Sequence, residues 1–241
     1  TLVADPMEPH YGGRYVLQVG GDRFAETVIG DTVGICRWST PGRAVQLNVA
    51  GGVISRFNLT TEHNSLEVSD FTAAAPVDIH WGGVHTVRTG VWHTSSHLGD
   101  DLIARLGVKP IRRSGDSLRA LYSWTRHKDL RLYGGGGFIF NIQGMRGRTT
   151  LQAGGEWYGP RVLKGAAQVF AAHDLQLFQR VQWTPSYNAR TGLRFGDSKR
   201  IAAARVFLEY FSGHQYFLQF MEMRENRWTL GINFEVGNPT R

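Results

Sequence analysis

The sequence predicts an all-β fold: a single antiparallel, up-and-down transmembrane β-barrel of about 12 strands, of the outer-membrane type. Three observations lead to this class. Apolar and polar residues alternate along most of the chain, the alternating segments are long, and aromatic residues stand at the ends of their apolar faces. No stretch approaches the roughly 18 uninterrupted apolar residues that a spanning helix requires, so a helical membrane protein is excluded.

Alternation with a period of two is clearest near the C-terminus. There, apolar residues interleave with polar or small ones in the order Arg227, Trp228, Thr229, Leu230, Gly231, Ile232, Asn233, Phe234, Glu235 and Val236. The same separation of two faces recurs around Leu193 and around Val206. Alternation alone fits either a soluble sandwich or a membrane barrel, because the strands of both have one apolar face.

Segment length, aromatic residues and charge favour the barrel. The segments run for roughly ten to fourteen residues, whereas strands of globular proteins average about five or six and a tilted membrane strand needs about ten. Their apolar faces end in aromatic residues such as Trp183 and Phe195, as at the interfaces of a bilayer. Their polar faces carry long charged side chains, such as Arg205 with Glu209, which a water-filled interior accepts.

Twelve segments alternate in this way, and they cover residues 14–20, 25–38, 43–58, 64–81, 84–97, 117–126, 129–142, 148–159, 165–175, 182–196, 200–212 and 226–236. An even number places both termini on one side of the membrane, with short turns on that side and longer connections on the other. The expected short turns are residues 40–42, 82–83, 127–128, 160–164 and 197–199, and the expected long connections are residues 98–116 and 213–225.

The domain organisation is simple. Residues 1–13, with Pro6 and Pro9, are expected to form an extended periplasmic arm, and residues 14–241 the transmembrane barrel. An outer-membrane location implies that a signal peptide has been removed before Thr1. The single cysteine excludes disulfide frameworks and cysteine-based zinc sites.

The charge of the chain indicates what fills the barrel. It has 27 Lys and Arg against 20 Asp and Glu, a formal net charge of +7. The arginines are scattered at nearly one per strand and do not cluster on one surface, so nucleic-acid binding is not expected. Their expected place is the lumen. The residues expected to line it are Arg88, Arg119, Arg131, Glu156, Arg190, Arg194, Arg205, Glu209, Arg227 and Glu235.

Several motifs resemble a bacterial family of predicted outer-membrane barrels known as domain of unknown function 1207. The motifs are Ala4-Asp5-Pro6, Gly30-Asp31-Thr32-Val33-Gly34, His93-Thr94-Ser95-Ser96-His97-Leu98-Gly99-Asp100-Asp101, Leu132-Tyr133-Gly134-Gly135-Gly136-Gly137-Phe138 and the closing segment from Trp228 to Val236. The resemblance covers nearly the whole chain. It implies a barrel fold and an outer-membrane location, but no established activity.

One stretch, His-Thr-Ser-Ser-His at the end of the fifth segment, indicates chemistry. Period two puts His93, Ser95 and His97 on the outward face, where a histidine two residues from a serine can act as its general base. This layout is similar to the outer-membrane phospholipase A family, which has a His-x-Ser pattern on an outward barrel face near the rim. The asparagine that orients the histidine in that family has no clear match, so Asp116 or Asp100 would replace it. The other interpretation is a polar rim whose side chains satisfy one another.

The sequence leaves three functions in different classes open, so whether the protein is an enzyme is undecided. The first is a passive barrel with an arginine-rich lumen, acting as a narrow, anion-preferring porin-like channel or as the membrane anchor of an envelope assembly. The alternative is a lipid hydrolase that uses Ser95 with His93 or His97. A soluble binding sandwich is a third hypothesis.

Partners and cofactors follow from these alternatives. The expected partners are membrane lipids and lipopolysaccharide, with envelope proteins in the case of an anchor. No cofactor is expected, except Ca²⁺ in the case of a lipid hydrolase. Asp100 and Asp101 would be candidate ligands for it, although two adjacent acids are a poor ligand set by themselves.

Overall fold

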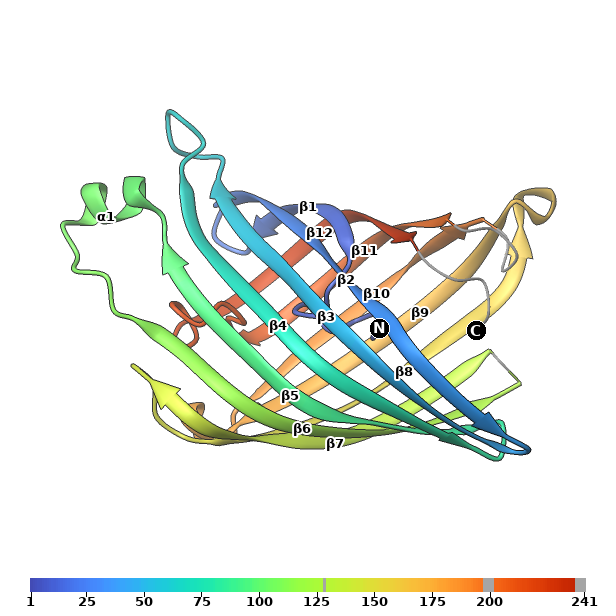
Figure 1. The fold of residues 1–241 in the computed structure, drawn as a ribbon. Helices are drawn as coiled ribbons and strands as arrows, with labels where there is room; N and C mark the ends of the chain where they lie inside the picture. Colours follow the sequence, from blue (N-terminus) through green and yellow to red (C-terminus); the bar gives the residue numbers. More distant parts are fainter. Residues whose placement is uncertain (128, 197–201, 237–241) are drawn as a thin grey trace.

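Twelve antiparallel strands close into one barrel in this structure, a computed structural model that describes residues 1–127, 129–196 and 202–236. Neighbours in the chain are neighbours in the sheet, and β1 closes the barrel against β12 (Figure 1). The strands are β1 (Tyr11–Gln18), β2 (Arg23–Thr40), β3 (Arg43–Asn58), β4 (Leu66–Trp81), β5 (His85–Leu98), β6 (Arg113–Arg126), β7 (Leu130–Gln143), β8 (Thr149–Val162), β9 (Ala167–Phe178), β10 (Pro185–Phe195), β11 (Ala202–His214) and β12 (Arg224–Val236). The fold class predicted from the sequence is confirmed.

The apolar face of the strands lies on the outside of the barrel. On β12, Leu230 is 59% exposed and Phe234 is 47% exposed, whereas Thr229, which lies between Trp228 and Leu230, is 1% exposed. A soluble sandwich would bury the first two side chains, because its apolar faces meet in a dry core. An outward apolar surface around a polar interior is the arrangement of a membrane barrel.

Short turns gather at one end of the barrel, as the sequence predicts. The β2–β3 turn passes through Gly42 and the β4–β5 turn through Gly82, each with a positive φ that glycine adopts without steric cost. The turn expected at residues 197–199 and the turn residue Lys128 lie outside the described residues.

The connection between β5 and β6 contains a short helix, α1 (Asp100–Leu106), where the sequence indicated only a long loop. Asp100 and Asp101 occupy its first turn, where negative charge favours the helix dipole. Gly107, with a φ of 61°, ends it in the left-handed conformation. None of the described helices is long and apolar enough to cross a membrane.

Most strand boundaries differ from those predicted, by up to four residues. β1 begins at Tyr11 and not at residue 14, and β6 begins at Arg113 and not at residue 117. β10 begins at Pro185 because Gln182 and Trp183 have positive φ in the turn after the 3₁₀-helix η2 (Gln179–Val181). A similar helix, η1 (Leu163–Gly165), joins β8 to β9.

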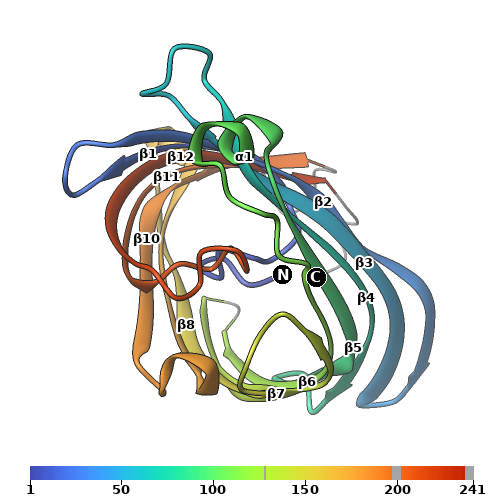
Figure 2. The same cartoon turned by 90° about the vertical axis from the view of Figure 1, so that its left-hand side faces the viewer.

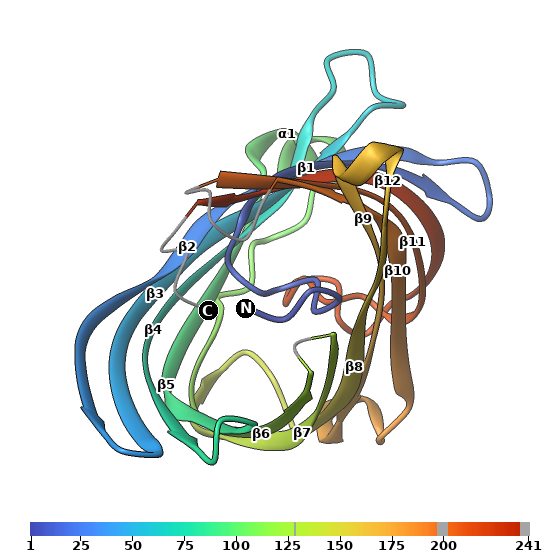
Figure 3. The same ribbon diagram turned by 90° about the vertical axis from the view of Figure 1, so that its right-hand side faces the viewer.

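The N-terminal arm, residues 1–10, folds into the barrel (Figures 2 and 3). Ala4 is fully buried, and its carbonyl accepts a hydrogen bond of 2.6 Å from Asn188 Nδ2. Val3 N donates to Glu156 Oε1 at 2.7 Å. The sequence predicted an arm on the periplasmic side but not this position, because a stretch without hydrophobic periodicity does not indicate which surface it covers.

The lumen loop, residues 215–223 between β11 and β12, also folds inward and lies within the barrel in Figure 2. Its Phe217 is 0% exposed and packs in a cluster with Val28 and Val68 from the barrel wall. Its Leu218 N donates to Asp70 Oδ2 at 2.8 Å. Arm and loop together give this membrane barrel an internal core.

Candidate functional site

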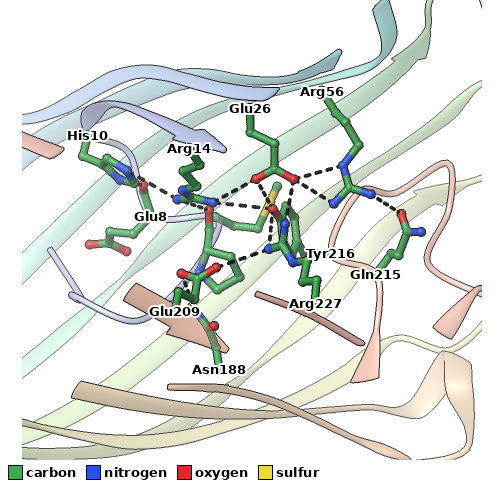
Figure 4. A network of polar contacts seen from close by, with 12 residues as sticks. Glu8, His10, Arg14, Glu26, Arg56, Asn188, Glu209, Gln215, Tyr216 and Arg227 are labelled. Atoms are coloured by element: carbon green, nitrogen blue, oxygen red, sulfur yellow. Dashed lines mark hydrogen bonds and ion pairs between the residues drawn. The ribbon is translucent and has the colours of Figure 1, made fainter. Parts of the chain in front are cut away.

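A network of buried ion pairs occupies the interior and centres on Glu26 of β2 (Figure 4). Its Oε1 accepts hydrogen bonds from Arg56 Nη2 at 2.7 Å and from Arg227 Nη1 at 2.9 Å. Its Oε2 accepts from Arg14 Nη1 at 3.4 Å and from the hydroxyl of Tyr216 in the lumen loop. The network therefore ties β1, β2, β3 and β12 to the loop.

Glu209 of β11 extends this network to the N-terminal arm. It accepts hydrogen bonds from Arg190, from Arg227 Nη2 at 3.4 Å and from Asn188 Nδ2 at 3.2 Å. Arg190 also donates to the carbonyl of Val3 in the arm. The sequence suggested that Glu209 pairs with Arg205, but the structure does not show this pair. Residues four apart in a strand lie about 13 Å apart, which is too far for an ion pair.

The other residues expected to line the lumen also turn inward. Arg88 donates to Asp78 at 2.7 Å, and Arg131 donates to Glu156 at 2.9 Å. Arg119 lies over the ring of Trp92, with 5.5 Å between the guanidinium carbon and the ring centroid. The remaining members, Arg194 and Arg205, share Glu235.

Sequence reasoning missed the centre of the network. Glu26 alternates with Thr27 and Ala25 but shares its inward face with the apolar Phe24 and Val28. A rule that assigns polar residues to the lumen and apolar ones to the lipid therefore fails on this strand. The other missed members are Arg14, Arg56 and Glu225.

The energetics of this network are those of a protein core. Glu26 and Arg56 are each 1% exposed and Arg227 is 0% exposed. Removing one partner of such a buried pair leaves an uncompensated charge and costs about 3–5 kcal/mol. These residues therefore hold the arm and the lumen loop in place, and a solute could not pass between them without breaking the pairs.

A second polar cluster lies on the outer face of the barrel. His93 on β5 and Asp116 on β6 are register partners, and His93 Nδ1 lies 2.6 Å from Asp116 Oδ1. Asn141 on β7 is the register partner of Asp116 and donates from Nδ2 to Asp116 Oδ2 at 2.7 Å. Three adjacent strands thus contribute one side chain each to a continuous chain of hydrogen bonds, called here the outer-face triad.

A β-bulge places Asn141 in this triad. The pairing of β6 with β7 shifts between Asp116 and Ser117, so Asp116 lies opposite Asn141 and not opposite Phe140. A bulge frees backbone groups from the ladder, and here Arg148 Nη1 donates to the carbonyl of Phe140 at 2.8 Å. The shift could not be read from the sequence, which is why Asn141 was not among the candidate residues.

Ser95 shares the outward face with His93, two residues further along β5 towards the rim. In the part of the chain that the structure describes, no hydrogen bond joins the two side chains. His97 packs edge-on against Phe71, with 5.7 Å between ring centroids, and does not contact Asp116. Ser96 points inward and donates to Asp70.

The triad fixes the chemistry available to His93. An ionised carboxylate accepts hydrogen bonds and cannot donate one. In the contact with Asp116, Nδ1 of His93 therefore carries the proton and donates it to the carboxylate. Nε2 of the neutral ring then has a free lone pair and can accept a proton from a hydroxyl. Of the two acids considered from the sequence, Asp116 and not Asp100 orients the histidine.

The structure offers little for a metal. Among the described residues, no group of three or more His, Cys, Asp or Glu side chains is arranged to hold one. Asp100 and Asp101 remain two adjacent acids at the start of α1. Ca²⁺ binding stays a prediction from the sequence, made for the case of a lipid hydrolase.

The outward apolar wall, the closed sheet and the polar interior define an integral barrel of the outer-membrane class. A model of the family described as protein of unknown function (DUF1207) matches residues 1–236, and the chain belongs to this family. The resemblance stated from the sequence motifs is therefore confirmed. No curated protein matches the chain by sequence.

Solved structures with a similar fold are outer-membrane proteins of different function. The Salmonella typhi outer membrane phospholipase dimer with bound calcium is 13% identical, with 98% of this chain and 93% of that chain covered and a TM-score of 0.60. The KdgM porin in complex with disordered oligogalacturonate is 9% identical, with 93% and 97% covered and a TM-score of 0.51. The transport unit of the autotransporter AIDA-I from Escherichia coli is 11% identical, with 94% and 88% covered and a TM-score of 0.51. At these identities the likeness shows the fold alone, and that fold is one found in outer-membrane proteins.

Proposed function

We propose that this protein is an outer-membrane lipid hydrolase that cleaves acyl esters with Ser95 as nucleophile, His93 as general base and Asp116 as the residue that orients His93. The observation that carries the proposal is the hydrogen bond of 2.6 Å between His93 Nδ1 and Asp116 Oδ1 on the outward face. Asn141 in turn holds Asp116. A nucleophile, a base and a group that orients the base are the parts that hydrolysis by serine requires.

The location of the triad supports a lipid substrate. His93 and Asp116 lie near the rim that carries α1, on the face that also presents Val91 and Leu118, which are 46% and 52% exposed. Polar side chains beside such an apolar wall are costly unless they pair or are used. An ester bond of a membrane lipid lies at the same boundary between headgroup and hydrocarbon, so lipids and lipopolysaccharide are the proposed substrates.

The proposed reaction proceeds in two steps. Ser95 Oγ attacks the ester carbonyl while its proton moves to His93 Nε2, and the alcohol leaves with that proton as an acyl-serine forms. Water, activated by the same nitrogen, then releases the fatty acid and restores the hydroxyl. A rotation of the Ser95 side chain towards His93 is required, and such contacts often tighten only when substrate binds.

The interior favours this proposal over a passive channel. The narrow channel requires a water path through the lumen, but Phe217 of the lumen loop, Ala4 of the arm and Arg227 of β12 are all 0% exposed. A channel would give anion-preferring conductance steps when the purified protein is added to a planar bilayer. An anchor predicts neither conductance nor hydrolysis.

The decisive experiment compares Ser95→Ala with Ser114→Ala. Ser114 is the register partner of Ser95 on β6, on the same outward face, and it takes no part in the triad. Purified variants are incubated with phospholipid vesicles or lipopolysaccharide, with and without Ca²⁺, and the released fatty acid is measured. We expect Ser95→Ala to lose about 10³-fold or more of the activity and Ser114→Ala to keep it. Equal release by the parent and Ser95→Ala would refute the proposal.

A further inference from the structure

A cavity of about 350 Å³ lies at the end of the barrel that carries the longer connections, the same end at which the outer-face triad lies. Three connections surround it: the one between β7 and β8, the 3₁₀-helix η2 and the lumen loop. Its lining residues are Gly144, Met145, Arg146, Arg180, Met221 and Glu222. The lining thus contains two arginines and one carboxylate, that of Glu222. In the interior network, by contrast, each arginine pairs directly with a carboxylate.

Arg180 carries a partly buried charge in this cavity that no described carboxylate pairs with. Its Nη1 lies 4.0 Å from the sulfur of Met145, and its guanidinium carbon is 4.4 Å from the centroid of the Phe178 ring. Its Nε is buried without a hydrogen-bond partner. Among the described residues, no carboxylate lies within 4 Å of its guanidinium, so the charge is held by a thioether and a ring.

The positive charges of two further arginines act on the guanidinium of Arg180. Burial, together with the like charges of Arg119 and Arg113, lowers the pKa of Arg180 to about 9. Arg119 contacts Ser117 Oγ and the ring of Trp92, and no described carboxylate forms an ion pair with it. Like charges destabilise a partly buried guanidinium such as that of Arg180, and a bound anion offsets this repulsion.

The nearby carboxylates are already engaged. Glu222 lies 3.6 Å from Arg113, with a side chain that is 75% exposed. Asp70 accepts hydrogen bonds from Ser96 and from Leu218 N. Neither can turn to Arg180 without giving up these partners.

We propose that this cavity is a binding site for a phosphate group, which Arg180 holds while Arg146, on the connection between β7 and β8, contributes a second guanidinium. Guanidinium groups suit phosphate because their planar N–H donors match its oxygens in pairs. The thioethers of Met145 and Met221 can adapt to whatever carries the phosphate. The site is separate from Ser95 and does not depend on the proposed hydrolysis.

The test is a calorimetric titration of the detergent-solubilised full chain with inorganic phosphate at low ionic strength. We expect the parent to bind and Arg180→Gln to bind at least about tenfold more weakly, with a smaller loss in Arg146→Gln, whose side chain is exposed. Arg37→Gln is the matched control, since it removes one positive charge from an exposed arginine that hydrogen-bonds to Gln46 on the hairpin β2–β3. It should bind as the parent does. Absence of binding to the parent, or equal binding by Arg180→Gln, overturns the proposal.

Two further arms complete the design. Arg180→Lys keeps the charge but not the planar donors, so it should bind phosphate with intermediate affinity, a result that a folding defect would not produce. Heat-dependent migration on a gel checks that each variant forms the barrel. The second arm repeats the titration in nanodiscs of phosphatidylcholine with or without phosphatidic acid. Competition by phosphatidic acid identifies a lipid headgroup as the occupant, and its absence identifies a free phosphate.

Discussion

At the scale of single residues, Asp116 carries the proposed chemistry because it decides which nitrogen of His93 bears the proton. Asp116→Asn should lower the rate of fatty-acid release by about 10²–10⁴-fold, since an amide can donate to the ring and favour the wrong tautomer. The substitution is nearly isosteric, so the barrel should form normally. The measurement is initial rates at saturating lipid.

Asn141→Ala provides the comparison at the same site. It removes the hydrogen bond of 2.7 Å to Asp116 but leaves the carboxylate charge in contact with His93. We expect a decrease smaller than that of Asp116→Asn. If Asp116→Asn retained the full rate, the triad would be a polar rim and His93 would not be a general base.

At the scale of the elements, strands were predictable and the segments inside the barrel were not. Period-two alternation is a local property, and it located β3 and β12 to within a few residues. The lumen loop depends on contacts between distant parts of the chain, such as Leu218 with Asp70. The outer-face triad was partly predictable, because His93 and Asp116 were candidates from the sequence, whereas Asn141 depends on a bulge that the sequence does not mark.

The N-terminal arm gives a prediction at this scale. Deleting residues 1–10 would remove the backbone carbonyls of Val3 and Ala4, which accept from Arg190 and Asn188, and would leave these side chains facing an empty space. Water should enter, and single-channel conductance in a planar bilayer should rise above that of the parent. Unchanged conductance, with the barrel intact by gel migration, would show that the lumen loop alone closes the path.

At the scale of the whole molecule, two media stabilise one chain in different ways. The outside is apolar because hydrocarbon solvates it, and the interior is held by ion pairs such as those of Glu26 and by packing around Phe217. This separation leaves the outer wall free to carry a polar site, provided that its side chains satisfy each other. His93, Asp116 and Asn141 meet that condition.

The membrane itself can be tested with one exposed leucine. Leu230, in the middle of β12, and Leu106, at the end of α1, are each 59% exposed. In water both would tolerate a charge, but an arginine facing the middle of a bilayer costs about 2–4 kcal/mol. Leu230→Arg should therefore lower the free energy of unfolding in lipid vesicles by that amount, and Leu106→Arg should leave it nearly unchanged, as measured by urea titration. Equal stabilities would mean that the face of β12 does not contact hydrocarbon, and the location of the triad beside a lipid substrate would lose its physical basis.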